Sequence, residues 1–287
     1  YGAAAQLAGQ VGYQLVQLQD SGDGGALSLA LLPASWSETQ GGGDQGRGMF
    51  FLRPRVEVDR PMALSAPHPR FDSDSGTVAA MAFRQLRARS LAIAGTHRCA
   101  NSALSGCSGS TSSCDSESSP YRESDMAHME RAFFQVFHER MDREYDRAIQ
   151  HIQVHGMGSS ADEPEFSISG GVTRDHDDPG FPSNRLASTL GEIVRAAGSS
   201  KPANSCNAPG QENMLCGTTN TQGRYTNGVD VAEVCMRSSG GNGVGRFIHA
   251  ELSRAIRNPA GSLGPQTFVD ALALVFPASA PPESSAP

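Results

Sequence analysis

The chain has 287 residues, of which 38% are hydrophobic, and it carries a formal net charge of −7 at neutral pH. This length can form one large domain with a substantial core, and no apolar run is long enough for a membrane-spanning helix. The excess of acidic side chains argues against nucleic acid as the main partner, because phosphate backbones attract basic surfaces.

Predicted strands and helices alternate from residue 60 onward. Short apolar runs bounded by turn residues predict strands at residues 13–20, 26–36, 48–56, 60–67, 90–95, 148–156 and 245–252. Apolar residues with helical periodicity predict helices at residues 76–89, 129–145, 183–198 and 266–276. Because strand, helix and strand follow in that order, we expect an α/β fold with a mainly parallel or mixed central sheet flanked by helices.

One domain is expected over residues 1–275, beginning with strands and Gly-rich turns at 1–48. Residues 102–120 and 199–228 have the composition of loops, and both contain cysteines. The Pro- and Ser-rich residues 276–287 resemble a linker or a disordered end. His138, on the helix at 129–145, is expected at the surface.

The six cysteines form no Cys-x-x-Cys pair, so three disulfides are expected to hold the polar loops. Cys206 and Cys216 are the nearest pair around one loop. The remaining four allow three pairings, of which we favour Cys107 with Cys114, leaving Cys99 for Cys235. A chain that begins with Tyr1 and uses disulfides suggests a processed protein that is secreted, periplasmic or at the cell surface. The absence of Asn-x-Ser/Thr favours a bacterial source.

Residues that can bind a metal ion follow the ends of separate predicted strands. His68 and Asp72 follow one strand, and His155 and Glu251 lie near the ends of two others. Ligand sites in open α/β sheets lie beyond the carboxyl ends of the strands. Two imidazoles and one carboxylate make a catalytic zinc site with a fourth position open for water, so His68, Asp72 and His155 are the predicted ligands.

Two alternatives stay open for these ligands. Asp74 competes with Asp72 as the carboxylate, although Asp72 is nearer to His68 in the sequence. His97, which follows the strand at 90–95, can replace either histidine.

Five segments, in this order, resemble the N-formylglutamate amidohydrolases and their relatives among the zinc carboxypeptidase-like hydrolases: APHPRFDSDSG, AGTHRCAN, YRESDMAH, QVHG and FIHAELSRAIR. The resemblance covers roughly residues 50 to 260 and implies a zinc exopeptidase-like fold. It implies zinc binding by His68, Asp72 and His155. The family often has His-x-x-Glu where this chain has His-x-x-x-Asp, which leaves the carboxylate ligand open.

The resemblance also implies the remaining roles. Glu251 matches the family's general base, and Arg98 and Arg122 match arginines that bind the substrate's carboxylate. A planar guanidinium suits that task because it can donate two parallel hydrogen bonds. Asn101 would assist Arg98, or it caps a loop.

Structural roles compete with some of these assignments. Glu251 could form a salt bridge with Arg254, Arg257 or Arg246. Arg122 could pair with Glu123 or Asp125. Asp125 and His128, three residues apart, either orient a metal ligand or cap the following helix.

These residues predict a zinc-dependent hydrolase that cleaves an amide bond adjacent to a carboxylate, in an N-acyl amino acid or a peptide. The expected partner is therefore a small carboxylate-bearing molecule or a peptide. The alternative is a non-catalytic exported surface or assembly protein on a hydrolase-like scaffold, which would act in a homo-oligomer or an extracellular assembly. Metal analysis distinguishes these two functions.

Overall fold

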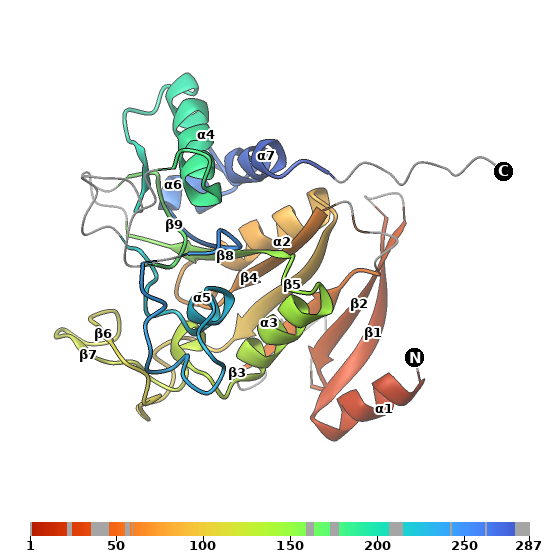
Figure 1. Ribbon diagram of the computed structural model, residues 1–287. Coiled ribbons are helices and arrows are strands. Elements are labelled where there is room, and N and C mark those ends of the chain that lie inside the picture. The colour runs from red at the N-terminus through yellow and green to blue at the C-terminus, as the bar shows by residue number, and fades with distance from the viewer. Residues whose placement is uncertain are drawn as a thin grey trace.

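A mixed β-sheet of nine strands forms the centre of the protein (Figure 1). The computed structural model describes residues 2–21, 25–35, 46–54, 58, 60–158, 164–172, 178–206, 215–241, 243–261 and 263–278. The strands are β1 (Tyr13–Asp20), β2 (Ala26–Pro33), β3 (Gly46–Leu52), β4 (Arg60–Ala66), β5 (Ala88–Gly95), β8 (Gln150–Gly156), β9 (Phe166–Ser169), β10 (Ala203–Ser205) and β11 (Phe247–Leu252). Across the sheet they follow the order β1-β2-β3-β5-β4-β8-β11-β9-β10.

The middle of the sheet is parallel, and an antiparallel pair joins it to the strands on each side. Strands β5, β4, β8 and β11 run parallel to one another, so their carboxyl ends meet at one edge. On one side β1, β2 and β3 add antiparallel strands. On the other side β9 is antiparallel to β11 and parallel to β10. The predicted α/β fold with a mixed sheet is therefore confirmed.

Helices cover both faces of this sheet (Figure 1). One face packs against α2 (Ser75–Gln85), α4 (Pro182–Ala196) and α7 (Gln266–Val275), and the large apolar core lies between them. The opposite face carries α3 (Phe133–Glu144) and α5 (Thr221–Thr226). The short α6 (Arg254–Arg257) follows β11, and α1 (Gly2–Gln10) packs beside β1.

Strand alternation sorts apolar and polar side chains between the two faces. On β8, Ile152 and Val154 belong to the large apolar core, so His151, Gln153 and His155 point to the opposite face. On β11 the core residues are likewise the even-numbered ones, which places His249 and Glu251 on the opposite face. Buried polar groups from both strands thus collect on the side of α3 and α5.

Several segments differ from the sequence-based prediction because their structure depends on distant partners. The expected loop 199–228 contains β10 and α5, and the loop 102–120 forms a small hairpin of β6 (Ser110–Thr111) and β7 (Ser119–Pro120). His138 is buried, so its predicted surface position is wrong.

Residues 279–287 of the predicted tail lie outside the described residues. Within the described residues, no helix combines the length and apolarity that a membrane crossing requires.

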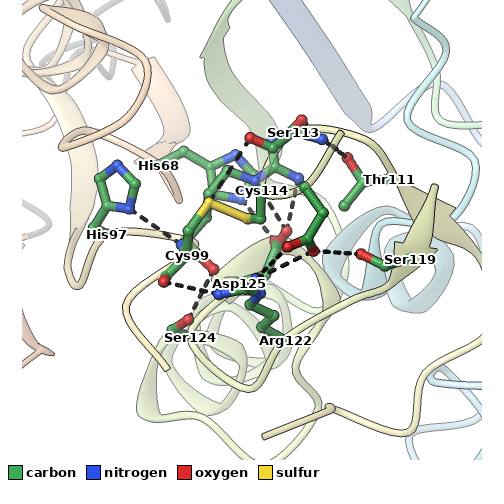
Figure 2. Close-up of a disulfide and its surroundings, with 12 residues drawn as sticks. His68, His97, Cys99, Thr111, Ser113, Cys114, Ser119, Arg122, Ser124 and Asp125 are labelled. Atoms are coloured by element: carbon green, nitrogen blue, oxygen red, sulfur yellow. Dashed lines mark hydrogen bonds and ion pairs between the residues drawn. A yellow bond between two sulfur atoms is a disulfide. The ribbon is translucent and has the colours of Figure 1, made fainter. Parts of the chain in front are cut away.

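Three disulfides are present, and only one has the predicted pairing. Cys206 pairs with Cys216, which is confirmed. The expected Cys107–Cys114 and Cys99–Cys235 pairs are wrong, because Cys99 pairs with Cys114 (Figure 2) and Cys107 pairs with Cys235.

Backbone hydrogen bonds explain this pairing. The N–H of Ser105 donates to the carbonyl of Tyr121, at 2.9 Å, and folds the loop back on itself. The N–H of Ser108 donates to the carbonyl of Cys235, also at 2.9 Å, and so brings Cys107 to its partner.

Candidate metal centre and cavity

A tight turn after β4 presents the first two predicted ligands. The backbone N–H of Asp72 donates to the carbonyl of His68, at 2.7 Å, and both side chains are buried. Asp74 instead adopts a left-handed conformation, with φ of 67°, where α2 begins, and it is exposed. The turn therefore directs Asp72, and not Asp74, toward the interior.

His155 arrives from the neighbouring strand and completes a group of three. β4 and β8 are paired through Ser65 and Gln153, so the residues that follow lie at the same edge. Asp72 Oδ2 lies 3.6 Å from His68 Nδ1 and 3.6 Å from His155 Nδ1. One ligand atom from each of these buried residues lies within 4.8 Å of the other two. The three side chains can therefore hold a metal ion, as can two overlapping groups that share His68 or His155 with other neighbours.

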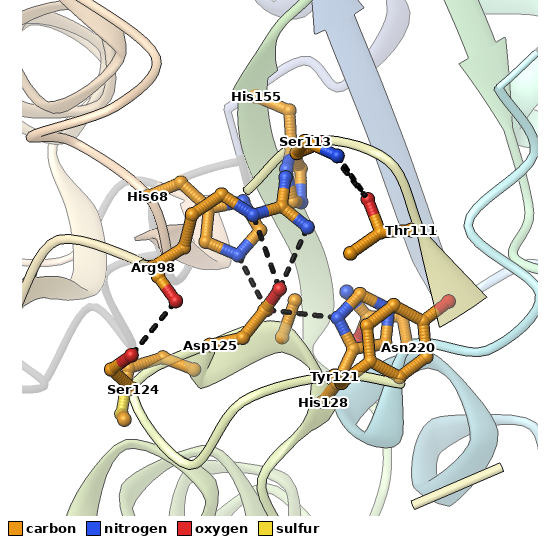
Figure 3. Close-up of polar contacts among 12 residues, drawn as sticks. His68, Arg98, Thr111, Ser113, Tyr121, Ser124, Asp125, His128, His155 and Asn220 are labelled. Carbon is orange, nitrogen blue, oxygen red and sulfur yellow. Dashed lines mark hydrogen bonds and ion pairs between the residues drawn. The ribbon is translucent and has the colours of Figure 1, made fainter. Parts of the chain in front are cut away.

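The second nitrogen of each histidine is already engaged. His68 Nε2 donates to Asp125 Oδ1 at 2.7 Å (Figure 3), and His155 Nε2 donates to Gln153 Oε1 at 2.8 Å. These bonds leave the Nδ1 lone pair of each ring available to a cation that Asp72 could also bind. His68 Nδ1 is buried and, among the described residues, has no hydrogen-bond partner. Since a buried polar atom without a partner is costly, this nitrogen fits a metal ion.

Asp125 connects the candidate metal ligands to the rest of the cavity wall. Its Oδ2 accepts two hydrogen bonds from Arg98, at 2.7 and 3.1 Å, and its Oδ1 accepts from His128 Nδ1 at 2.8 Å as well as from His68. Burial opposes the charge on Asp125, but the adjoining His68 and His128 rings outweigh it and hold the pKa of this carboxyl well below its usual range. The structure thus gives Asp125 the orienting role rather than the helix-capping one.

Glu251 lies beside His155, with which it is paired across β8 and β11. Its Oε1 is 4.0 Å from His155 Nδ1 and 3.5 Å from His249 Nε2. Burial, reinforced by the negative charge of Asp72, raises the pKa of Glu251 to about 8. A carboxylate in this environment is suited to accept or release a proton near neutral pH.

The alternative for Glu251, a salt bridge to Arg254, Arg257 or Arg246, is absent from the ion pairs of the described residues. Arg257 donates instead to the backbone carbonyls of Leu252, Met157 and Ser73. Arg246 binds Asp142, on α3. Both cations are thus engaged elsewhere.

The charges of the two remaining ligands follow from their contacts. Burial favours the neutral acid of Asp72, but the adjacent rings of His155 and His68 outweigh it and lower its pKa. Burial lowers the pKa of His155 to about 4, despite the nearby carboxylate. An ionised carboxylate beside a neutral imidazole is the pair of states that metal ligation needs.

These side chains line a cavity of about 410 Å³. The walls include the candidate metal ligands, Arg98 and Glu251 together with Phe71, Ser110, Thr111, Ser113, Tyr121, His128, Gly156, Met157, Gly158, Leu215, Cys216, Gly217, Thr218, Thr219, Asn220 and His249. Cys99–Cys114 encloses the segment that supplies Ser110 to Ser113, and Cys206–Cys216 adjoins the segment that supplies Gly217 to Asn220. Two disulfide-held loops therefore build much of the wall.

Three other predicted residues lie outside the cavity. Arg122 binds the carboxylate of Asp115, at 2.9 Å, and the carbonyls of Cys99 and Asn101, so it braces the disulfide loop (Figure 2). Its predicted partners Glu123 and Asp125 are not the ones it binds. Asn101 is exposed, and its backbone N–H donates to Ser124 Oγ. His97 Nδ1 accepts from the backbone N–H of Cys99 and does not reach the candidate ligands.

Sequence reasoning missed several residues of this site. Gln153 fixes the orientation of His155, and it could have been noticed because it lies two residues earlier on the same face of one strand. Thr219 reaches the cavity from the expected loop at 199–228, where no local pattern marks it. Tyr121 begins the segment YRESDMAH, but the sequence assigns it no role of its own.

Comparisons with known proteins add little to this geometry. No protein family and no curated protein matches the chain. Among solved structures, the chain is similar to one described as the crystal structure of gene product Atu2144 from Agrobacterium tumefaciens, at 13% identity and a TM-score of 0.41. The similarity covers 76% of this chain and 88% of that one.

Proposed function

We propose that the protein is a zinc-dependent hydrolase that cleaves an amide bond adjacent to a carboxylate, in an N-acyl amino acid or a short peptide. The observation that carries this proposal is the convergence of two oriented imidazole nitrogens and one ionised carboxylate on a cavity that also holds Glu251. The resemblance of the sequence to N-formylglutamate amidohydrolases agrees with it.

The donor set favours zinc among the common metal ions. His68 and His155 supply nitrogen and Asp72 supplies oxygen, which is a typical catalytic zinc shell with one position left open. When bound there, zinc polarises a carbonyl and lowers the pKa of a bound water to near 7. The bonds from His68 to Asp125 and from His155 to Gln153 keep the ligating nitrogens aimed at that position.

Glu251 would handle the protons of the reaction. Its Oε1 lies at the edge of the group of candidate ligands, where it can take a proton from water and return it to the leaving nitrogen. The charge of Asp72 helps to keep this carboxyl protonated, and a bound cation would offset that charge. Metal binding would therefore favour the ionised form of Glu251.

Arg98 is the candidate for binding the substrate's carboxylate. Nε and Nη2 bind Asp125, and no hydrogen bond from Nη1 falls within the described part of the chain. The guanidinium lines the cavity, so Nη1 can donate to a ligand. The pairing with Asp125 would hold the arginine in place before substrate binds.

The three disulfides support an oxidising location such as the periplasm, the cell surface or the medium. They also hold the loops around the cavity, which agrees with a small-molecule or peptide substrate more directly than with an assembly surface.

The test combines metal content with hydrolysis. Purified protein should contain about one zinc per chain, and chelation should abolish hydrolysis in a panel of N-formyl and N-acetyl amino acids and dipeptides until zinc is restored. Asp72→Asn should lose both metal and activity, whereas Asp74→Asn should keep both. Zinc-loaded protein that hydrolyses nothing in the panel would support the non-catalytic alternative, and protein that binds no zinc would overturn the metal centre itself.

A further inference from the structure

A chain of hydrogen bonds runs from Asp125 across the cavity wall. Asp125 Oδ1 lies 2.8 Å from His128 Nδ1, and His128 Nε2 lies 3.1 Å from Thr219 Oγ1. The hydroxyl of Tyr121 lies 2.8 Å from the same Thr219 oxygen. The rings of Tyr121 and His128 are stacked, with centroids 3.5 Å apart and planes 6° apart (Figure 3).

The direction of every bond in this chain follows from its first member. The ionised Asp125 carboxylate can only accept, so His128 donates from Nδ1. Arg98 already balances the charge of Asp125, and a second buried cation would have no counter-charge, so His128 is neutral and its Nε2 accepts. Thr219 therefore gives its one hydrogen to His128, and Tyr121 must donate to Thr219.

The Thr219 hydroxyl therefore has fixed hydrogen-bond donor and acceptor roles. Its hydrogen is used and one of its lone pairs receives the Tyr121 hydroxyl, so the oxygen can offer only an acceptor to the cavity. Thr111, on the same wall, differs because it donates to the Ser113 hydroxyl at an exposed position, where both groups can rotate. The fixed acceptor of Thr219 is thus a feature that a ligand with a hydrogen-bond donor would recognise.

We propose that Thr219 is a substrate-binding residue that accepts a hydrogen bond from an amide N–H of the substrate, with His128 and Asp125 as the positioning residues that fix its polarity. This inference rests on the proposed amide hydrolysis and names the substrate group that Thr219 recognises. A secondary amide is then preferred over the matching ester, because an ester oxygen would meet the Thr219 oxygen without a hydrogen between them.

A matched pair of probes tests this preference. Benzoylglycyl-phenylalanine and benzoylglycyl-phenyllactate differ only in the N–H that the ester replaces with oxygen. Thr219→Val should lower kcat/KM for the amide roughly tenfold, the value of one uncharged hydrogen bond, and leave the ester rate unchanged or higher. Thr219→Ser keeps the hydroxyl and should restore the preference for the amide.

Thr226→Val provides the control. The Thr226 hydroxyl also bonds a buried histidine, His138 Nε2, at 2.8 Å, but it does not line the cavity. This variant loses a comparable Thr–His hydrogen bond and should keep the amide-to-ester ratio of the wild type. Zinc content and melting temperature of all three variants show whether the folded metal site is retained.

Two results separate the failure of this inference from that of the proposed function. If the wild type hydrolyses the amide and Thr219→Val keeps the wild-type amide-to-ester ratio of kcat/KM, Thr219 does not bind the N–H. If the zinc-loaded wild type hydrolyses neither probe, the proposed function fails, and calorimetric binding of the two probes then decides on Thr219. Equal affinity for both probes, or no binding of either, overturns the inference.

Discussion

Two buried clusters of histidine and aspartate lie on the same face of the sheet, yet their chemistry differs. The cavity cluster consists of His68, Asp72, Asp125 and His155. The core cluster consists of His138, Asp142, His151 and Arg246. Both are formed by residues of the parallel strands and of the segments that cover them.

The polar side chains of the core cluster bond to one another and to Thr226. Arg246 binds the Asp142 carboxylate, His151 Nε2 lies 3.3 Å from the same carboxylate, and His138 Nε2 bonds the Thr226 hydroxyl. The space beside it amounts to about 10 Å³, scarcely enough for one water molecule. These residues are not among the groups of the described chain that could hold a metal ion.

The cavity cluster does the opposite. The Nε2 atoms of His68 and His155 are bound to Asp125 and Gln153. Both Nδ1 atoms face Asp72 and an open volume of about 410 Å³. The comparison teaches that residue type does not distinguish a candidate metal site from a structural cluster. What distinguishes them is which polar atoms the fold leaves without a protein partner.

The largest contrast is expected for the two histidines of β8. His155→Ala removes a ligand and should leave the purified protein without bound metal, whereas His151→Ala should keep about one metal per chain and lose stability instead. Elemental analysis after dialysis and thermal unfolding measure the two effects. Metal retained by His155→Ala would mean that His155 is not a ligand.

A second contrast concerns two of the buried glutamates, Glu251 and Glu139. Glu251→Gln keeps the shape of the side chain but removes the base, so hydrolysis should fall by about 10²–10⁴ with metal content unchanged. Glu139, on α3, accepts a hydrogen bond from Gln135 and pairs with Arg143, away from the cavity. Glu139→Gln should therefore leave hydrolysis near the wild-type rate, and equal losses in both variants would contradict a base role for Glu251.

The two orienting aspartates give a smaller effect. Asp125→Asn weakens the acceptor that fixes His68, and metal affinity should fall by roughly 10- to 100-fold. Asp142→Asn disturbs His151 and Arg246 and should cost about 1–3 kcal/mol of unfolding free energy without changing metal affinity. Competition with a chelator and denaturant titration measure the two quantities. An Asp125 variant with unaltered affinity would show that the bond to His68 is dispensable.

The smallest effect is the pH dependence of the core cluster. Burial lowers the pKa of His138 and His151 in the folded protein below the ordinary 6.5, so the unfolded chain takes up protons first as pH falls. The stability is complete above pH 6.5 and declines below it, by at most about 1.4 kcal/mol per pH unit for each proton.

His138→Gln removes one of these titrations while retaining a side chain that can bond Thr226. The decline between pH 6.5 and 5 should therefore become shallower in denaturant titrations. An unchanged slope would show that His138 does not titrate with unfolding.

Much of the fold could be predicted from the sequence. Apolar runs gave β4, β5, β8 and β11, and helical periodicity gave α2, α3, α4 and α7, because these patterns are local. The short β9 and β10 and the six-residue α5 were missed, since they are held by neighbours far away in the sequence. The wrong disulfide pairing has the same cause, because sequence proximity favoured Cys107–Cys114 over the pair with Cys235.

The sequence by itself determined that His68, Asp72, His155 and Glu251 lie near the carboxyl ends of parallel strands, because strand direction and alternation follow from the order and periodicity of residues. Only the tertiary structure decided that Asp72 faces inward while Asp74 faces solvent. It also decided that Asp125 and Gln153 orient the imidazoles and that Thr219 reaches the cavity. These contacts join segments distant in sequence, so they depend on how the whole chain packs and not on any local pattern.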